Sequence, residues 1–275
     1  MILKQLFSNT YYLVKNNLIL VQPLLIFFLV LSILVSPVAF SGGINIAVII
    51  MFASVAGLFC AFWAGWYNMF HKSIEYVDKL NITPEEKALN SLNLFKEFFP
   101  GVGKYFLKIV LGFIIYFIFI VVLILVIQLI GDKFIGFPQS INADEMMKAA
   151  SNSDKVLALL HKITPADKIK IMQWDLLGII IIGFFSYITM FWTQAVISEG
   201  KRPFKAYWES IKTVFKNPVA TMVIYSSQCA GIIGVSFISA AYSLNVVIQF
   251  IALVVLTLVI IYFTMMSFLY FERYR

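Results

Sequence analysis

The chain has 275 residues, of which 61% are hydrophobic and 13% are charged, and its formal net charge is +7. Soluble domains are about half apolar and about a quarter charged, so this composition excludes a water-soluble fold. The apolar residues stand in blocks of the roughly 20 residues that a helix needs to cross a bilayer. The sequence therefore predicts an all-α, polytopic membrane helical bundle and not a barrel of alternating strands.

Six transmembrane helices are predicted within a single integral membrane domain that covers residues 1–275. The first apolar run is longer than the apolar region of a signal peptide, so we expect it to be a retained span. A longer excursion on the outer side, residues 131–170, separates the third span from the fourth. The predicted spans are approximately residues 18–40, 44–70, 105–130, 171–197, 219–242 and 244–270.

Amphipathic helices are predicted ahead of the first and second pairs of spans. In the N-terminal helix, apolar residues such as Leu6 oppose Lys4 and its polar neighbours. In the second helix, Thr83 and Glu86 form a capping box, which is a fairly specific helix start. Pro100 is expected to end this second helix.

The segment EGKRPFKAYWESIKTVFKNP, residues 199–218, predicts a third amphipathic helix. Aromatic residues follow helical spacing on one face and lysines occupy the other. Pro203 suits the first turn, and Pro218 interrupts the helix as the fifth span begins. A helix of this kind lies in the headgroup plane of a membrane. The predicted interfacial, lipid-binding residues are Lys205, Lys212, Lys216, Phe204, Tyr207 and Trp208.

The three amphipathic helices end in similar phrases, LVKNN, LFKEF and VFKNP, each around one lysine. Lys15 and Lys96 are 81 residues apart, and Lys96 and Lys216 are 120 apart, a difference that the outer excursion accounts for. The chain is thus hypothesised to contain three units, each an interfacial helix followed by a hairpin of two spans. Chance similarity within apolar sequence is the alternative.

The distribution of lysine and arginine predicts the orientation, because these residues are retained on the cytoplasmic side in short loops. With both termini cytoplasmic, 15 of the 21 basic residues lie inside. The charge is therefore explained by topology, although anionic lipid headgroups or an acidic partner could also bind this side. The inner basic residues are Lys4, Lys15, Lys72, Lys79, Lys87, Lys96, Lys104, Lys108, Lys201, Arg202, Lys205, Lys212, Lys216, Arg273 and Arg275.

Small residues recur at helical spacing in spans two and five, which allows two helices to approach closely. We therefore predict that spans two and five lie centrally, whereas spans three and six, rich in Ile, Val, Leu and Phe, face lipid. The predicted packing residues are Ala53, Gly57, Ala61, Gly65, Ser227, Gly231 and Gly234.

The sequence offers few residues suited to catalysis. No span has an ionisable residue near its centre, and polar residues at that depth include Gln194, Gln228 and Gln249. These glutamines are expected to bond between helices, or else to line a polar path for a neutral solute. His71 and His161 fall on opposite sides of the membrane in this topology, so they cannot share a metal. No metal site, no cofactor and no enzymatic activity are predicted.

The outer excursion is expected to hold two or three short helices. Asp144 and Glu145 suit a helix N-terminus as capping residues. Thr164, Pro165 and Asp167 form a second helix-start signature. A surface cover, a lid over the bundle and a docking site all remain open for this segment.

The phrases FKAYWESIKTVFKNP and MMSFLYFERYR resemble a family of six-span bacterial membrane proteins. The family includes the YciC group and the membrane domain attached to some glycerophosphodiester phosphodiesterases. Its last span typically ends in an aromatic phrase followed by an acid and Arg, as in Tyr270, Phe271, Glu272 and Arg273. The resemblance excludes the outer excursion and implies no hydrolase activity, because no segment is long enough for the catalytic barrel.

Two functions fit these observations. The first is a non-enzymatic integral membrane protein of the bacterial cytoplasmic membrane, acting as a lipid-associated or partner-binding bundle. Its expected partners are membrane lipids, anionic ones in particular, and a membrane or cytoplasmic protein, but no nucleic acid. The alternative is a carrier or permease component for a neutral or lipidic solute.

Overall fold

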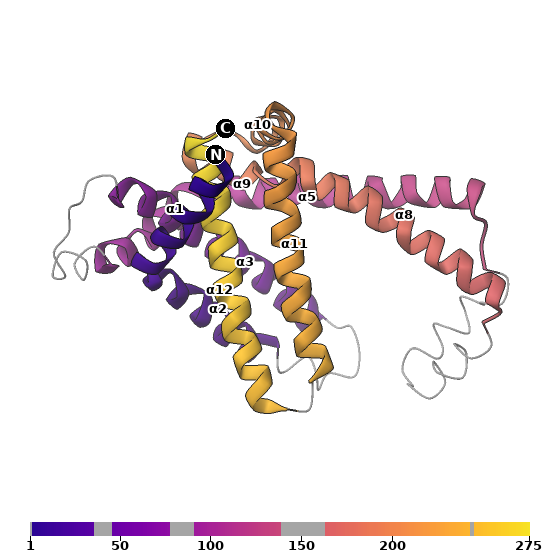
Figure 1. The fold of residues 1–275 in the computed structure, drawn as a ribbon. Helices are drawn as coiled ribbons and strands as arrows, with labels where there is room; N and C mark the ends of the chain where they lie inside the picture. The colour runs from indigo at the N-terminus through magenta and orange to yellow at the C-terminus, as the bar shows by residue number, and fades with distance from the viewer. Residues whose placement is uncertain (1, 36–45, 78–90, 139–162, 243–244) are drawn as a thin grey trace. The chain divides into compact units, whose positions relative to one another are not determined.

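A computed structural model describes residues 2–35, 46–77, 91–138, 163–242 and 245–275, and within these ranges every regular element is helical (Figure 1). The all-α fold class is thereby confirmed. Residues 91–96 form a further helical segment ahead of α5. The elements are α1 (Ile2–Asn16), η1 (Leu18–Leu20), α2 (Val21–Val35), α3 (Ile46–Val77), α5 (Phe98–Phe134), α8 (Pro165–Thr189), α9 (Trp192–Glu199), α10 (Pro203–Lys216), α11 (Pro218–Ala241) and α12 (Val246–Arg273).

The described helices are those of a multi-pass membrane protein. Five are long and apolar enough to cross a bilayer, and the number rises to six if the pair α1 and α2, bent by 77°, counts as one span. In the third unit of the hypothesis the short helix α10 precedes the longer α11 and α12, whereas in the first unit α1 and α2 both have 15 residues. Several helices extend beyond the predicted spans, because hydropathy marks only the apolar part of a helix whose charged ends are also helical.

Contacts divide the chain into two units, one of residues Met1–Ile114 with Ile188–Arg275 and one of residues Ile115–Tyr187. The smaller unit contains the second part of α5 and most of α8. There the ring of Trp174 occupies the space beside Gly131, where a Cβ would lie 2.2 Å from it. The Trp174 indole also donates to the carbonyl of Gly136, at 3.2 Å.

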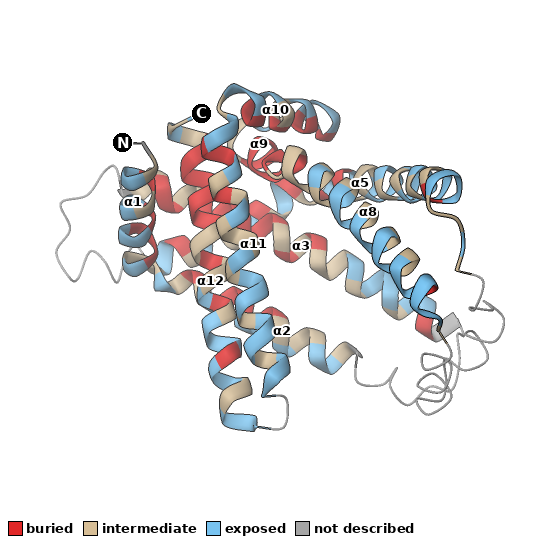
Figure 2. Cartoon of the chain, turned by 45° about the vertical axis from the view of Figure 1, so that its right-hand side comes forward, coloured by how far each residue is buried: buried red, intermediate tan, exposed pale blue. Residues whose placement is uncertain are grey.

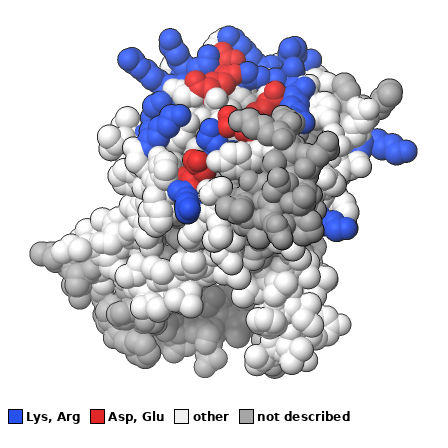
Figure 3. Space-filling model, turned by 90° about the vertical axis from the view of Figure 1, so that its left-hand side faces the viewer, with Lys and Arg blue, Asp and Glu red and all other residues white. Residues whose placement is uncertain are grey.

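The core of the larger unit lies at one end of its long helices, as the buried residues in Figure 2 show. Aromatic rings from distant segments meet there. Phe70 of α3 stacks on Phe268 of α12, with centroids 6.0 Å apart. Phe191 stacks on Tyr270 at 5.5 Å. On the face shown in Figure 3, Lys and Arg gather at this same end, where α10 and the end of α12 lie in Figure 1.

The opposite ends of these helices expose apolar side chains. Val246, Phe250 and Phe237 are 81%, 66% and 74% exposed, and they come from the ends of α11 and α12 that are far from the core. Exposed apolar surface of this extent marks contact with a membrane or a partner. The larger unit thus combines a packed, charged end with helix ends suited to hydrocarbon.

The structure corrects two sequence predictions of where helices end. Pro100 does not end a helix. It is the third residue of α5, where an amide would have no helical partner to lose, and the break falls at Glu97. The fourth span is interrupted between α8 and α9 at residues Met190 and Phe191, whereas one continuous helix was expected.

The predicted helix starts at Thr164 and Pro218 are confirmed. The hydroxyl of Thr164 accepts from the amide of Asp167 at 3.2 Å, and α8 begins at Pro165. Helix α11 begins at Pro218, with Asn217 accepting from the amide of Ala220 at 3.4 Å. The capping box at Thr83 and Glu86 and the residues Asp144, Glu145 and His161 lie outside the described residues.

The central and lipid-facing assignment of the spans is wrong for two of them. Helix α11 was expected at the centre, but only 11% of its most apolar 18-residue stretch is buried. The corresponding value for α3 is 28%. Helix α12, expected to face lipid, supplies the buried residues Met265 and Phe268. Hydropathy did not separate these cases because both ends of α12 are apolar, and only one of them packs against the core.

Candidate functional site

Helix α10 has three faces, although the sequence predicted two. The buried face consists of Pro203, Ala206, Tyr207, Ser210, Thr213 and Val214. An apolar row next to it exposes Phe204, Trp208 and Phe215 at 69%, 57% and 61%. The row of Lys205, Lys212 and Lys216 is exposed as well. The aromatic and basic rows are therefore neighbours on the outer surface of a helix that is fixed to the protein by its third face.

Tyr207 is a correction to the predicted site, because it is only 5% exposed. It lies about 100° around the helix from Trp208, which is enough to turn it into the buried face. Its hydroxyl donates to the carbonyl of Gly112 at 2.9 Å, and its ring stacks on Trp192 with centroids 5.1 Å apart. Tyr207 thus binds α10 to α5 and α9.

Ser210 binds α10 to the interruption of the fourth span. Its hydroxyl accepts from the amide of Phe191 at 3.0 Å and donates to the carbonyl of Ile188 at 2.9 Å. Backbone groups freed by a broken helix must be satisfied inside a membrane protein. Sequence reasoning missed this role, since a serine within an amphipathic helix gives no signal of what it contacts.

The exposed rows of α10 hold few internal bonds. The ammonium of Lys212 lies 5.7 Å from the ring centre of Trp208 and 3.4 Å from a carboxylate oxygen of Glu209. Lys205 and Lys216 form no ion pair with the carboxylates that the structure describes. An aromatic row beside unpaired lysines is the arrangement of side chains at a membrane interface.

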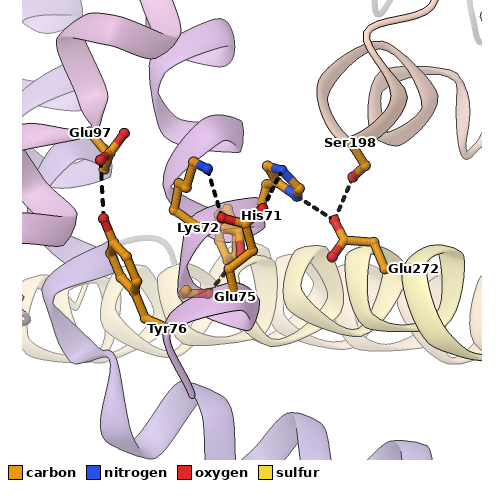
Figure 4. A network of polar contacts seen from close by, with 9 residues as sticks. His71, Lys72, Glu75, Tyr76, Glu97, Ser198 and Glu272 are labelled. Atoms are coloured by element: carbon orange, nitrogen blue, oxygen red, sulfur yellow. Dashed lines mark hydrogen bonds and ion pairs between the residues drawn. The ribbon is translucent and has the colours of Figure 1, made fainter. Parts of the chain in front are cut away.

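A polar network joins α3, α9 and α12 at the same end of the larger unit (Figure 4). His71 Nδ1 lies 2.8 Å from Glu272 Oε1, and His71 Nε2 lies 3.3 Å from Glu75 Oε1. Ser198 donates to Glu272 Oε1 at 2.5 Å, and Lys72 donates to Glu75 Oε2 at 2.6 Å. Both histidine contacts are hydrogen bonds only when the imidazole carries two protons.

This network does not have the geometry of a nucleophilic triad. A serine nucleophile needs its hydroxyl hydrogen-bonded to a histidine nitrogen that removes the proton. Here Ser198 and His71 both contact the same oxygen of Glu272, so the serine hydroxyl is not hydrogen-bonded to the histidine. Among the described residues, no group of three or more His, Cys, Asp or Glu side chains could hold a metal ion.

The terminal aromatic phrase is structural. Tyr270 and Phe271 are buried, and Arg275 lies 4.1 Å over the ring of Phe271 while pairing with Glu199. Partial burial lowers the pKa of Arg275, yet the guanidinium remains charged in proteins. The aromatic residues of the phrase that carries the family resemblance are therefore part of the packed core.

The three glutamines of the predicted polar path do not line one described pocket. Gln249 binds across the hairpin of α11 and α12, since its amide donates to the carbonyls of Ser239 and Tyr242 at 2.5 and 3.1 Å. Gln194 is 3% exposed and contacts Thr193 at 2.9 Å. A pocket of about 490 Å³ includes Gln249 but neither Gln194 nor Gln228.

Close packing is found at two of the predicted small residues. A Cβ on Gly65 would lie 2.8 Å from the carbonyl of Phe98, and one on Gly231 would lie 2.8 Å from the ring of Phe263. A Cβ on Gly57 or on Gly234 would meet nothing within 4 Å. Among the other predicted packing residues, Ala53 is exposed, Ala61 lines a pocket, and Ser227 donates to the carbonyl of Val223 in its own helix.

Comparison of the chain with family models, with curated proteins and with solved structures finds no significant match. The resemblance to the six-span bacterial family thus stays a prediction.

Proposed function

We propose that this multi-pass membrane protein is a non-enzymatic, lipid-associated bundle that holds anionic phospholipids along the exposed rows of α10. The supporting observation is the geometry of this helix. Its buried face is fixed to the larger unit through Tyr207 and Ser210, and its outer surface presents Trp208 beside Lys205 and Lys212. Aromatic rings favour the headgroup level, and lysines attract anionic lipid there.

The proposed location is the bacterial cytoplasmic membrane, with both termini on the cytoplasmic side. The supporting argument is the retention of basic residues on that side. The same orientation places the lysines of α10 against the leaflet in which anionic lipids give a negative surface potential.

Native mass spectrometry of protein extracted with its lipids tests the proposal. The variant carries Lys205→Gln, Lys212→Gln and Lys216→Gln. Each lysine near an anionic surface contributes about 1 kcal/mol, so the three together contribute about 3 kcal/mol, and the triple variant should bind anionic lipid roughly a hundredfold more weakly. Neutral lipid should be retained as in the wild type.

The matched control carries Lys4→Gln, Lys15→Gln and Lys168→Gln, three exposed lysines outside α10. It changes the net charge by the same amount and should leave lipid retention unchanged. Equal loss in both variants would show that total charge, and not α10, attracts the lipid. If a copurifying protein were lost only from the α10 variant, the ligand of α10 would be a protein partner and not a lipid.

The alternative proposal is a carrier for a neutral or lipidic solute. Its support is weaker, because Gln194 and Gln249 bond within the protein and do not share a described pocket. Solute uptake into liposomes that contain the purified protein would favour it, especially if Gln228→Leu abolished the uptake.

A further inference from the structure

An apolar pocket of about 260 Å³ lies between α2, α3 and the start of α5. Ten side chains line it, and every one is apolar. Helix α2 supplies Ile26 and Val30, α3 supplies Leu58 and Ala61, and Phe99 belongs to α5. Its ten lining residues include none of the residues that form the exposed rows of α10.

The lining excludes ligands that need hydrogen bonds. A polar group transferred into such a pocket would lose its water without gaining a partner. Glu97 stands between the lining residues Phe95 and Phe98 in the sequence. Its carboxylate accepts a hydrogen bond from the hydroxyl of Tyr76 at 3.1 Å. Its carbonyl accepts from Asn68 at 2.9 Å, so Glu97 is bound to α3 and does not line the pocket.

The position of the pocket indicates a hydrocarbon occupant. Helix α3 and the segment Ser91–Phe134 both belong to the candidate membrane spans. Ile26 and Phe99, two of the lining residues, are 54% and 71% exposed, and inside a bilayer such surface contacts lipid chains. In the sequence, the exposed Lys96 follows the lining residue Phe95 directly, and its charge suits a phosphate.

We propose that this pocket binds one acyl chain of a membrane phospholipid, whose phosphate lies at Lys96. The chain would cover the exposed surfaces of Ile26 and Phe99, and an apolar chain matches a lining that offers no hydrogen-bonding group. The site goes beyond the proposed function, because its walls consist of other residues and do not depend on lipid binding at α10.

Photocrosslinking in vesicles tests the site. The full-length protein is reconstituted into phosphatidylcholine vesicles that contain a trace of phosphatidylglycerol or phosphatidylcholine with a diazirine in one acyl chain. Crosslinked peptides are then located by mass spectrometry. Labelling should concentrate on the pocket walls, and Ala61→Phe, which fills the pocket, should reduce it several-fold.

The matched control is Ala53→Phe, the same change two turns earlier in α3, at an exposed alanine that does not line the pocket. It should leave labelling unchanged. Val30→Phe fills the pocket from the opposite wall and keeps the test valid if Ala61→Phe fails to fold. Labelling spread evenly over the apolar helices, or labelling that survives both filled variants, would overturn the proposal.

The two lipid proposals fail separately. The triple lysine variant of α10 should keep the pocket labelling, and the filled pocket should keep anionic lipid at α10. Equal labelling by the two probes would assign the binding to the chain and phosphate, which both lipids share. Labelling by phosphatidylglycerol alone would show that the site also recognises the net negative charge of the headgroup.

Discussion

Gly112 shows how the absence of one side chain positions α10. The ring of Trp192 occupies the space beside this glycine, and Tyr207 then stacks on Trp192 while donating to the Gly112 carbonyl. A Cβ on Gly112 would lie 2.2 Å from Trp192. The contact between α5, α9 and α10 therefore depends on glycine at this position.

Gly112→Ala should destabilise the protein by about 1–3 kcal/mol, because the added methyl group overpacks the Trp192 contact. The measurement is the midpoint of chemical unfolding in detergent. Gly103→Ala is the control on the same helix, since nothing lies within 4 Å of a Cβ there. It should be neutral or slightly stabilising, because alanine favours a helix. Equal midpoints for the two variants would contradict the packing argument.

At the scale of the element, α10 and the interrupted fourth span form one structure. Ser210 bonds to backbone groups on both sides of the interruption, so the interfacial helix holds the two parts of the span together. Membrane helices tolerate such interruptions only where another element satisfies the freed backbone groups. The position of α10 is thus coupled to the conformation of residues 188–191.

Ser210→Ala should increase amide hydrogen exchange at Phe191, and it should cost about 1–3 kcal/mol, because a buried amide and a carbonyl lose their partner. Hydrogen exchange followed by mass spectrometry measures the first effect. Ser227→Ala serves as the control, since Ser227 donates only to the carbonyl of Val223 in its own helix. Unchanged exchange at residues 188–191 would show that the interruption needs no support from α10.

The sequence predicted the helices of these elements but not their contacts. Apolar residues continue through Met190 and Phe191 without a proline or glycine, so hydropathy gives no sign of the interruption. In α10, the aromatic row and the buried face are both apolar in part, so spacing alone placed Tyr207 with Trp208. Whether an apolar row meets protein or lipid is decided by tertiary packing, which a single segment does not record.

At the scale of the whole molecule, the two chain ends lie together in the larger unit. Asn9 donates to the hydroxyl of Tyr274 at 3.0 Å, and Tyr262 donates to the carbonyl of Phe7 at 3.2 Å. A chain that starts and ends on the same side of a membrane crosses it an even number of times. We therefore expect six spans, the number reached when the bent pair α1 and α2 is counted as one.

Single cysteines at Ser8 and Arg273 test this parity, in a chain that also carries Cys60→Ala and Cys229→Ala. Both positions are exposed, so both should react with a membrane-impermeant maleimide from the same side of sealed vesicles. Reaction from opposite sides would contradict six spans. The sequence had predicted six from hydropathy, but it could not pair His71 with Glu272, which are 201 residues apart.

The polar network also makes a stability prediction for the molecule. Glu272→Gln removes the charge that accepts from Ser198 and His71, and hydrogen bonds to charged groups contribute about 1.5–3 kcal/mol. The unfolding midpoint should fall accordingly. Glu209→Gln, an exposed pair on α10, is the control and should change little. A similar midpoint for both would assign the network no role in the fold.

The contribution of α12 to the core has a consequence for biosynthesis. Because α12 follows α1, α3 and α9 in the chain, the ribosome makes it after all three. Phe70 and Phe191 therefore lack their stacking partners Phe268 and Tyr270 until translation is nearly complete. A nascent chain interrupted before residue 265 would present this unfilled aromatic surface to chaperones and membrane proteases, which act on exposed apolar surface in unfinished proteins.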